Sequence, residues 1–185
     1  ADGKLKHGGK ITTNILPKNV IASYSGEDTR LWDSYYRLVY ERYCSKLTAD
    51  NQGFAPPFMF YLSKYQWEIA LLVLLYSEDV DVIEFISNLV GQKKCTITID
   101  YANTNFPKWE GTTTLAFVEK LKEKHTYTIN ELRNVINNVS FIDQSSTLFY
   151  YLYRSTVSVD NKLINKINIK FDDGSDLESL SEGEK

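Results

Sequence analysis

The stretch at residues 69–76, with the sequence IALLVLLY, constrains the fold of this chain more than any other feature. It lies between Glu68 and Glu78, and it is too short for a membrane span, which needs about 20 apolar residues. Because leucine and alanine outnumber β-branched residues, we expect a buried helix over 58–76; a strand over 69–76 is the alternative. A helix that is apolar on all sides needs neighbours on all sides. The sequence therefore predicts a core built around this helix, and no membrane span.

Apolar side chains at three- and four-residue spacing predict further amphipathic helices. We expect these helices over residues 28–47, 80–90, 113–125 and from 129 onward, the last behind the capping-box pair Thr128 and Glu131. In the first of them, one helical face is expected to carry Leu31, Tyr35, Leu38, Val39, Arg42 and Tyr43. The aromatic and β-branched stretch at 147–159 predicts a helix that passes into a strand.

Strands are predicted where isoleucine alternates with polar residues. The clearest is CTITIDY at residues 95–101, while KLINKINIKF at 162–171 predicts an exposed edge strand or an extended arm. Short β-prone pieces lie within residues 11–25. The fold class we predict is mostly α with a minor β component (α+β), in a single compact helix-rich domain with flexible charged termini.

Charge is concentrated at the two ends of this 185-residue chain, whose formal net charge is −3. Residues 1–10 contain three lysines and one aspartate, and residues 172–185 contain six carboxylates and one lysine. The body between them therefore carries no net charge. We expect a flexible basic arm over 1–10, a single globular domain over 11–171 and a flexible acidic tail over 172–185, because segments with few apolar groups do not fold alone.

The sequence lacks the motifs of common enzymes and metal sites. There is no GxxxxGK[ST] phosphate loop, no GxGxxG turn and no HExxH helix, and neither His7 nor His125 neighbours a nucleophile pattern. Cys44 and Cys95 form no CxxC pair and are too few for a disulfide scaffold, which favours buried free thiols and an intracellular setting, in the cytoplasm or a virion. The sequence thus favours a non-enzymatic protein with no metal or cofactor.

Lysines and aromatic residues cluster around the strand predicted at 95–101. Six of them form a candidate site for single-stranded nucleic acid: Lys93, Lys94, Tyr101, Phe106, Lys108 and Trp109. In such sites aromatic rings stack on bases while lysines contact phosphates. The isoelectric point of about 5.5 argues against a strongly electrostatic DNA-binding protein, and solvated surface lysines are the alternative interpretation.

Three serines of the acidic tail have an acidic residue three positions later, and they are Ser175, Ser179 and Ser181. Acidophilic kinases modify serines in such surroundings, and a phosphate group would add negative charge to a tail that is already negative. We therefore treat these three serines as candidate phosphorylation sites.

The segment NVIASYSGEDTRLW, at residues 19–32, raises a second possibility. A strand-like piece followed by GEDTR resembles the first strand and loop of plant TIR domains, and the segments at 69–77 and 97–100 resemble later strands of that family. The resemblance implies an α/β domain that cleaves NAD or signals, with Glu84 nearest to the family's catalytic glutamate, although the family's Trp-Cys pair is missing. The alternative is that Glu27 and Asp28 are acidic residues at the positive end of a helix dipole.

The aromatic content of 14%, the neutral body and the oppositely charged ends favour an interaction or assembly protein. A concrete form is a viral coat or nucleocapsid-type subunit that self-associates and contacts single-stranded nucleic acid. Two alternatives remain: the TIR-like domain, and a monomeric regulatory or host-interaction module that binds a protein partner through the acidic tail.

Overall fold

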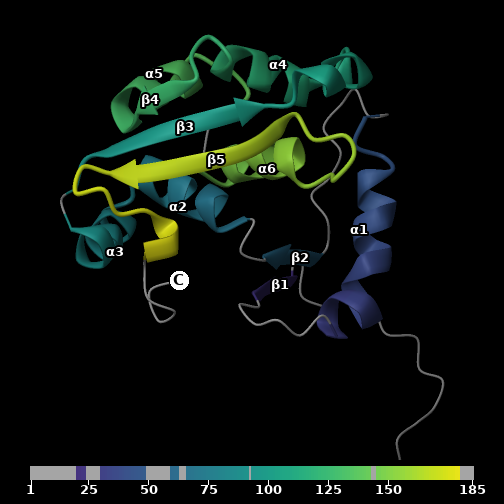
Figure 1. Ribbon diagram of the computed structural model, residues 1–185, viewed down its shortest axis with the longest axis horizontal. Helices are drawn as coiled ribbons and strands as arrows, with labels where there is room; N and C mark the ends of the chain where they lie inside the picture. The colour runs from purple at the N-terminus through teal and green to yellow at the C-terminus, as the bar shows by residue number, and fades with distance from the viewer. Residues whose placement is uncertain are drawn as a thin grey trace, which may run out of the picture.

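An antiparallel three-stranded sheet organises the fold (Figure 1). The structure, a computed structural model, describes residues 20–23, 30–48, 59–62, 66–91, 93–142 and 145–179. The strand order is β4–β3–β5, where β3 is Cys95–Tyr101, β4 is Thr126–Thr128 and β5 is Ile164–Phe171. β3 pairs along its whole length with β5, so the predicted strand at 95–101 is confirmed and β5 lies at the edge of the sheet, as the sequence predicts.

The two faces of this sheet differ because isoleucine alternates with polar residues along both long strands. Ile97 and Ile99 of β3 lie opposite Ile169 and Ile167 of β5, and all four are buried. On the other face Thr96 and Thr98 are exposed, and the charged pair Asp100 and Lys166 lies opposite each other at its end. One face is therefore part of the core, and the other is polar.

Helices cover the apolar face. α2 (Trp67–Tyr76) and α6 (Ser145–Thr156) pack on each other and on β5, while α5 (Ile129–Asn137) contacts β3 (Figure 1). α4 (Thr113–Leu121) packs on both α5 and α6, and α3 (Val80–Val90) packs on α2. A 3₁₀ segment, η4 (Asn103–Trp109), connects β3 to α4. The mostly helical α+β class predicted from the sequence is confirmed.

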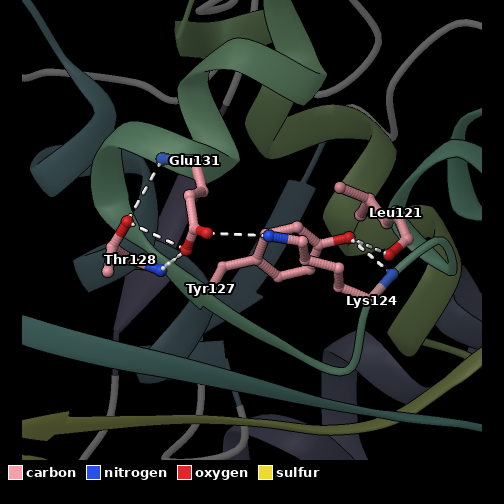
Figure 2. Close-up of polar contacts among 5 residues, drawn as sticks. All are labelled: Leu121, Lys124, Tyr127, Thr128 and Glu131. Atoms are coloured by element: carbon pink, nitrogen blue, oxygen red, sulfur yellow. Dashed lines mark hydrogen bonds and ion pairs between the residues drawn. The ribbon is translucent and has the colours of Figure 1, made fainter.

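α5 begins with the capping box that the sequence predicts (Figure 2). The Thr128 hydroxyl oxygen accepts the Glu131 backbone N–H at 3.3 Å, and the Glu131 carboxylate accepts the Thr128 backbone N–H at 2.9 Å. Lys124 adds an ion pair to the same carboxylate at 2.7 Å. Two otherwise unpaired N–H groups are thereby satisfied at the first turn of the helix.

α1 (Arg37–Cys44) stands at one side of the molecule, away from the sheet (Figure 1). A π-helical turn, η2 (Trp32–Tyr36), precedes it and continues into it without a break. Nearby, β1 (Val20–Ser23) and β2 (Met59–Leu62) form a separate two-stranded parallel sheet. The helix predicted over 28–47 is confirmed from Arg30 to Cys44, where it ends three residues earlier than predicted and a turn follows.

Three predicted elements are wrong in their extent. The helix predicted over 58–76 begins only at α2, because residues 59–62 pair with β1 as a strand, a tertiary contact that periodicity does not reveal. The helix predicted over 113–125 ends at Leu121, and β4 follows it. The segment at 147–159 does not pass into a strand, since α6 continues to Thr156 and turns follow it.

Beyond Phe171 the chain turns back, and Asp176 pairs with Lys170 of β5 in an isolated antiparallel bridge. Phe171 donates its backbone N–H to the Ser175 carbonyl at 2.8 Å, and Lys93 forms an ion pair with Asp173 at 2.6 Å. A short 3₁₀ turn, η5 (Leu177–Ser179), ends the described chain. The basic arm over 1–10 and the last residues of the acidic tail lie outside the described residues.

None of the helices in the described ranges has the length and apolar content needed to cross a membrane. Both cysteines are free thiols, Cys95 buried and Cys44 half-buried, which agrees with the expectation of free thiols.

Candidate protein-interaction surface

η2 and α1 form one continuous helical segment, which exposes apolar side chains on one side. Tyr35 is 71% exposed, Leu38 76% and Val39 36%. Their spacing of three and four residues places them on one face of the helix, and Arg42, also exposed, continues the same face by one more turn. We call these four residues the α1 outer face.

The opposite side of the same helix is buried by tyrosines. Tyr36 and Tyr43 are nearly inaccessible, and Leu47, just beyond the helix, is fully buried. The Tyr36 and Tyr153 hydroxyl oxygens lie 2.7 Å apart, and the Tyr40 hydroxyl donates to the carbonyl of Val157 at 3.0 Å. α1 therefore has two apolar stripes, of which only one packs against the protein.

Aromatic rings fill the space between α1, β2 and α6. The ring centroids of Phe60 and Tyr153 lie 5.1 Å apart, and those of Phe149 and Tyr153 lie 5.9 Å apart in a stacked arrangement. Such pairs contribute roughly 0.5–1.5 kcal/mol beyond the area they bury. This aromatic layer holds the helix in place and so fixes the direction in which the α1 outer face points.

Burial keeps the groups that anchor α1 protonated. Loss of hydration on burial raises the pKa of Tyr40 to about 12 and that of the Cys44 thiol to about 11. The same cause raises the pKa of Tyr153 above its ordinary value. The hydroxyl contacts are thus uncharged near neutral pH. A protonated Cys44 is a weak nucleophile, which fits a structural role.

The sequence predicts that Tyr35, Leu38, Val39 and Tyr43 share one helical face, and the structure divides them between two. Tyr35, Leu38 and Val39 belong to the exposed stripe, whereas Tyr43 belongs to the buried one. The signal that distinguishes them is a second stripe at the same spacing, which consists of Trp32, Tyr36, Tyr40, Tyr43 and Leu47. A helix with two apolar stripes has more apolar surface than one protein layer can cover.

The residues proposed to bind nucleic acid lie at opposite ends of β3. Lys93 and Lys94 are exposed just before its first residue, and Lys93 is engaged by Asp173. Tyr101 is buried at the other end, where its hydroxyl donates to the Leu121 carbonyl at 2.6 Å. A strand of seven residues spans roughly 20 Å, so the structure does not gather these side chains into one site.

The remaining members of that set lie in or beside η4. Trp109 is fully buried and donates its indole N–H to the Asn161 carbonyl at 2.6 Å, which leaves no ring face exposed for stacking on a base. Phe106 is half-buried with the Lys122 ammonium 4.7 Å from its ring centroid, and Lys108 is exposed and bonded to the Asn161 side chain at 2.9 Å. Of the predicted residues in η4, Phe106 and Lys108 reach the surface, and Trp109 does not.

The candidate phosphorylation sites differ in their surroundings. The Ser175 hydroxyl donates to the Asp173 carboxylate, and the Ser179 hydroxyl donates to the Asp176 carbonyl at 2.6 Å. Ser179 is exposed, whereas Ser175 is half-buried. Ser181 lies outside the described residues.

Two of the segments that resemble the TIR family have other structures here. Residues 69–76, which the resemblance compares to a strand, are in helix α2, and the strand at 95–101 belongs to an antiparallel sheet. Glu84 is exposed on α3. Residues 26–29 of the GEDTR motif lie outside the described residues, and Arg30 begins the helical segment.

A surface cavity of about 240 Å³ lies between α4 and α5, lined by Lys120, Glu123, Asn134, Val135 and Asn138. It is smaller than typical small-molecule sites of about 300–1,000 Å³. The described residues bring together no group of three or more metal-ligating side chains. No family model, curated protein or solved structure matches this chain.

Proposed function

We propose that this protein is a non-enzymatic assembly protein that self-associates through the α1 outer face. The observation that carries the proposal is a rigidly anchored helix whose second apolar stripe is exposed, with Leu38 at 76% at its centre. Isolated surface apolar residues are common, but a contiguous stripe on a fixed helix is typical of a protein-binding surface.

The chemistry of the stripe favours a second copy of the same chain as the partner. If two copies of α1 pack antiparallel about a two-fold axis midway between positions 38 and 39, helical spacing places Leu38 against Val39 of the partner subunit. The same symmetry places Tyr35 against Arg42 of the partner subunit, twice. Arg42 has no ion-pair partner among the described residues, and an arginine over a tyrosine ring is a favourable cation–π pair.

The size of this surface indicates a weak contact. One helix face from each copy buries less than the roughly 1,200–2,000 Å² of stable complexes. We therefore expect a dissociation constant in the micromolar range or weaker. Weak two-fold contacts suit a subunit that is held in a larger assembly by several such surfaces, as in the coat-type function that the sequence suggests.

The experiment that tests the proposal is a dilution series of the ¹⁵N-labelled protein from about 1 mM to 20 µM, followed by NMR and light scattering. We expect the amide signals of Tyr35, Leu38, Val39 and Arg42 to shift with concentration while the mean mass rises above one chain. Signals that shift instead on α3, around the exposed Val80, Ile83 and Phe85, would contradict the assignment to α1. A mass of one chain throughout would contradict self-association and favour the monomeric module.

A further inference from the structure

α3 exposes apolar side chains beside carboxylates. Val80 is 76% exposed and Ile83 is 48% exposed. Residues three and four positions apart are neighbours on the surface of a helix, so Val80 lies beside both Ile83 and Glu84. The apolar pair alone does not say what covers it, since single exposed apolar residues are common. The charges around it do.

Four exposed carboxylates accompany this pair at the start of the helix: Glu78, Asp79, Asp81 and Glu84. No lysine or arginine occurs from residue 77 to residue 92, and none of the four carboxylates forms an ion pair with a described residue. Arg133 reaches the end of α2, where it donates to the carbonyls of Leu75 and Ser77. We call the four carboxylates, together with Val80 and Ile83, the α3 acidic face.

The arrangement of these groups favours an extended cationic segment over a metal ion. The described residues bring together no group of three or more metal-ligating side chains, so the carboxylates do not converge on one point. A lysine fits both parts of the surface, because its methylene stem covers apolar side chains while its ammonium group reaches a carboxylate. The α3 acidic face therefore suits a segment with several lysines.

The basic arm, residues 1–10, is such a segment. It carries Lys4, Lys6 and Lys10 against a single aspartate. In an extended chain Lys4 and Lys6 lie roughly 7 Å apart, close to the roughly 5–6 Å that separates positions such as Asp81 and Glu84 on a helix. The charges and their spacing are thus complementary.

The basic arm is also long enough to reach α3 of its own chain. The described chain begins at Val20, sixteen residues after Lys4. A segment of that length spans up to roughly 50 Å, whereas a compact domain of this size is roughly 40 Å across.

The acidic tail is the other target of opposite charge. In its described part Asp173 already forms an ion pair with Lys93, and no large apolar side chain is exposed. The α3 acidic face offers carboxylates without ion pairs in the described part of the chain and an apolar surface beside them.

We propose that the α3 acidic face binds the basic arm of the same chain. Lys4 and Lys6 pair with Asp81 and Glu84, and their methylene stems cover Val80 and Ile83. The connection within one chain gives the arm an effective concentration of about a millimolar, so a weak contact forms within a chain in preference to between chains. This contact is separate from the α1 outer face and does not depend on self-association.

The test is NMR of the ¹⁵N-labelled full-length chain at 20 µM, comparing the wild type with Lys4→Gln/Lys6→Gln/Lys10→Gln. A matched control changes the net charge equally by replacing three other exposed lysines with glutamine: Lys94, Lys166 and Lys170. Each protein is measured at 20 mM and at 1 M NaCl, where the Debye length falls to about 3 Å.

We expect the amide signals of residues 80–84 to differ from the wild type in the arm variant at 20 mM NaCl, and the difference to vanish at 1 M NaCl. The control should leave these signals unchanged. A carbodiimide, which joins ammonium and carboxylate groups in contact, should crosslink residues 1–10 of the wild type to the peptide that contains Asp81 and Glu84. The crosslink should occur in chains of single mass and be at least fivefold less abundant at 1 M NaCl.

Three results would overturn the proposal. The first is an arm variant with unchanged signals for residues 80–84, and the second is an equal change in the control. The third is a crosslink pattern in which the arm joins the acidic tail instead, or joins α3 only in species of twice the mass of one chain.

Discussion

The hydroxyl groups of Tyr36 and Tyr153 lie 2.7 Å apart in the core, although 117 residues separate them in the sequence. Together with the bond from Tyr40 to the Val157 carbonyl, this contact fastens α1 to the end of α6. It explains how a helix at the side of the molecule keeps one face buried while it presents the other to solvent. The α1 outer face depends on this attachment for its orientation.

Removing both hydroxyls of this pair should destabilise the fold by less than the two single removals added together. Tyr36→Phe or Tyr153→Phe leaves a buried hydroxyl with a lost partner and should lower the free energy of unfolding by about 1–2 kcal/mol. The double variant should lose less than the sum of the two single changes. Urea denaturation measures each value, and Tyr35→Phe, on the exposed stripe, serves as the control that should leave stability unchanged. Additive losses would contradict a direct contact.

The ion pair of Glu131 predicts a specific acid sensitivity (Figure 2). Hydrogen bonds from Lys124 and Thr128 lower the pKa of Glu131 from 4.5 to about 2. Its stabilising effect is complete above pH 4.5 and is lost as the pH falls through 2, because the unfolded chain takes up the proton first. The stability difference between wild type and Glu131→Gln should therefore be largest near neutral pH and vanish toward pH 2.

Denaturation of both proteins at several pH values measures this difference. Glu119→Gln, which removes an exposed carboxylate of α4 with no ion pair among the described residues, is the matched control for the loss of a surface charge. If the stability difference between the wild type and Glu131→Gln stayed constant from pH 7 to pH 2, this would contradict the ion pair between Glu131 and Lys124.

Gly91 ends α3 in a backbone conformation that other residues avoid. Its φ is 71° and its ψ is −167°, and a Cβ there would meet only the Lys93 side chain at 4.0 Å. Gly91→Ala should thus cost about 1–3 kcal/mol through backbone strain and not through crowding. Thermal unfolding checks this, with Asn88→Ala on the exposed side of α3 as the control. An unchanged Tm for Gly91→Ala would show that residue 91 does not adopt this positive-φ conformation at the end of α3.

The proposed two-fold contact predicts a role for Arg42 in association. Two cation–π pairs with Tyr35 of the opposite copy, at about 0.5–1 kcal/mol each, mean that Arg42→Ala should raise the dissociation constant roughly 5- to 30-fold. Arg37→Ala removes an exposed arginine that pairs with Glu41 in its own chain at 2.9 Å, and it should change association little. Equal effects of the two changes would indicate general electrostatics and not the paired contact.

Much of the fold follows from local sequence signals. The Thr/Ile alternation of β3, the Thr128–Glu131 box and the Gly91 stop are each determined by neighbouring residues, and the structure has all three. β2 was missed because the pairing that makes Met59–Leu62 a strand comes from β1, far away in the sequence. β4 was missed because three residues are too few to show a period.

The candidate site was less accessible to sequence reasoning. Periodicity identifies which residues share a helical face, but it does not say which face the protein covers, and Tyr35 and Tyr43 were therefore assigned together. Trp109 and Lys108 are adjacent in the sequence and were assigned to one site. In the structure, however, Trp109 is buried and Lys108 is exposed. Nucleic-acid binding around Lys93 and Lys94 stays a prediction, and so does phosphorylation of Ser175, Ser179 and Ser181.

The most direct test of the central claim is sedimentation equilibrium of the wild type beside Leu38→Asp and Val80→Asp. Leu38 and Val80 are both 76% exposed, so either change should leave the monomer folded, as circular dichroism can verify. We predict concentration-dependent association of the wild type and of Val80→Asp, and a dissociation constant at least tenfold higher for Leu38→Asp. Association that survives Leu38→Asp, or a wild type that is monomeric at millimolar concentration, would contradict self-association through the α1 outer face.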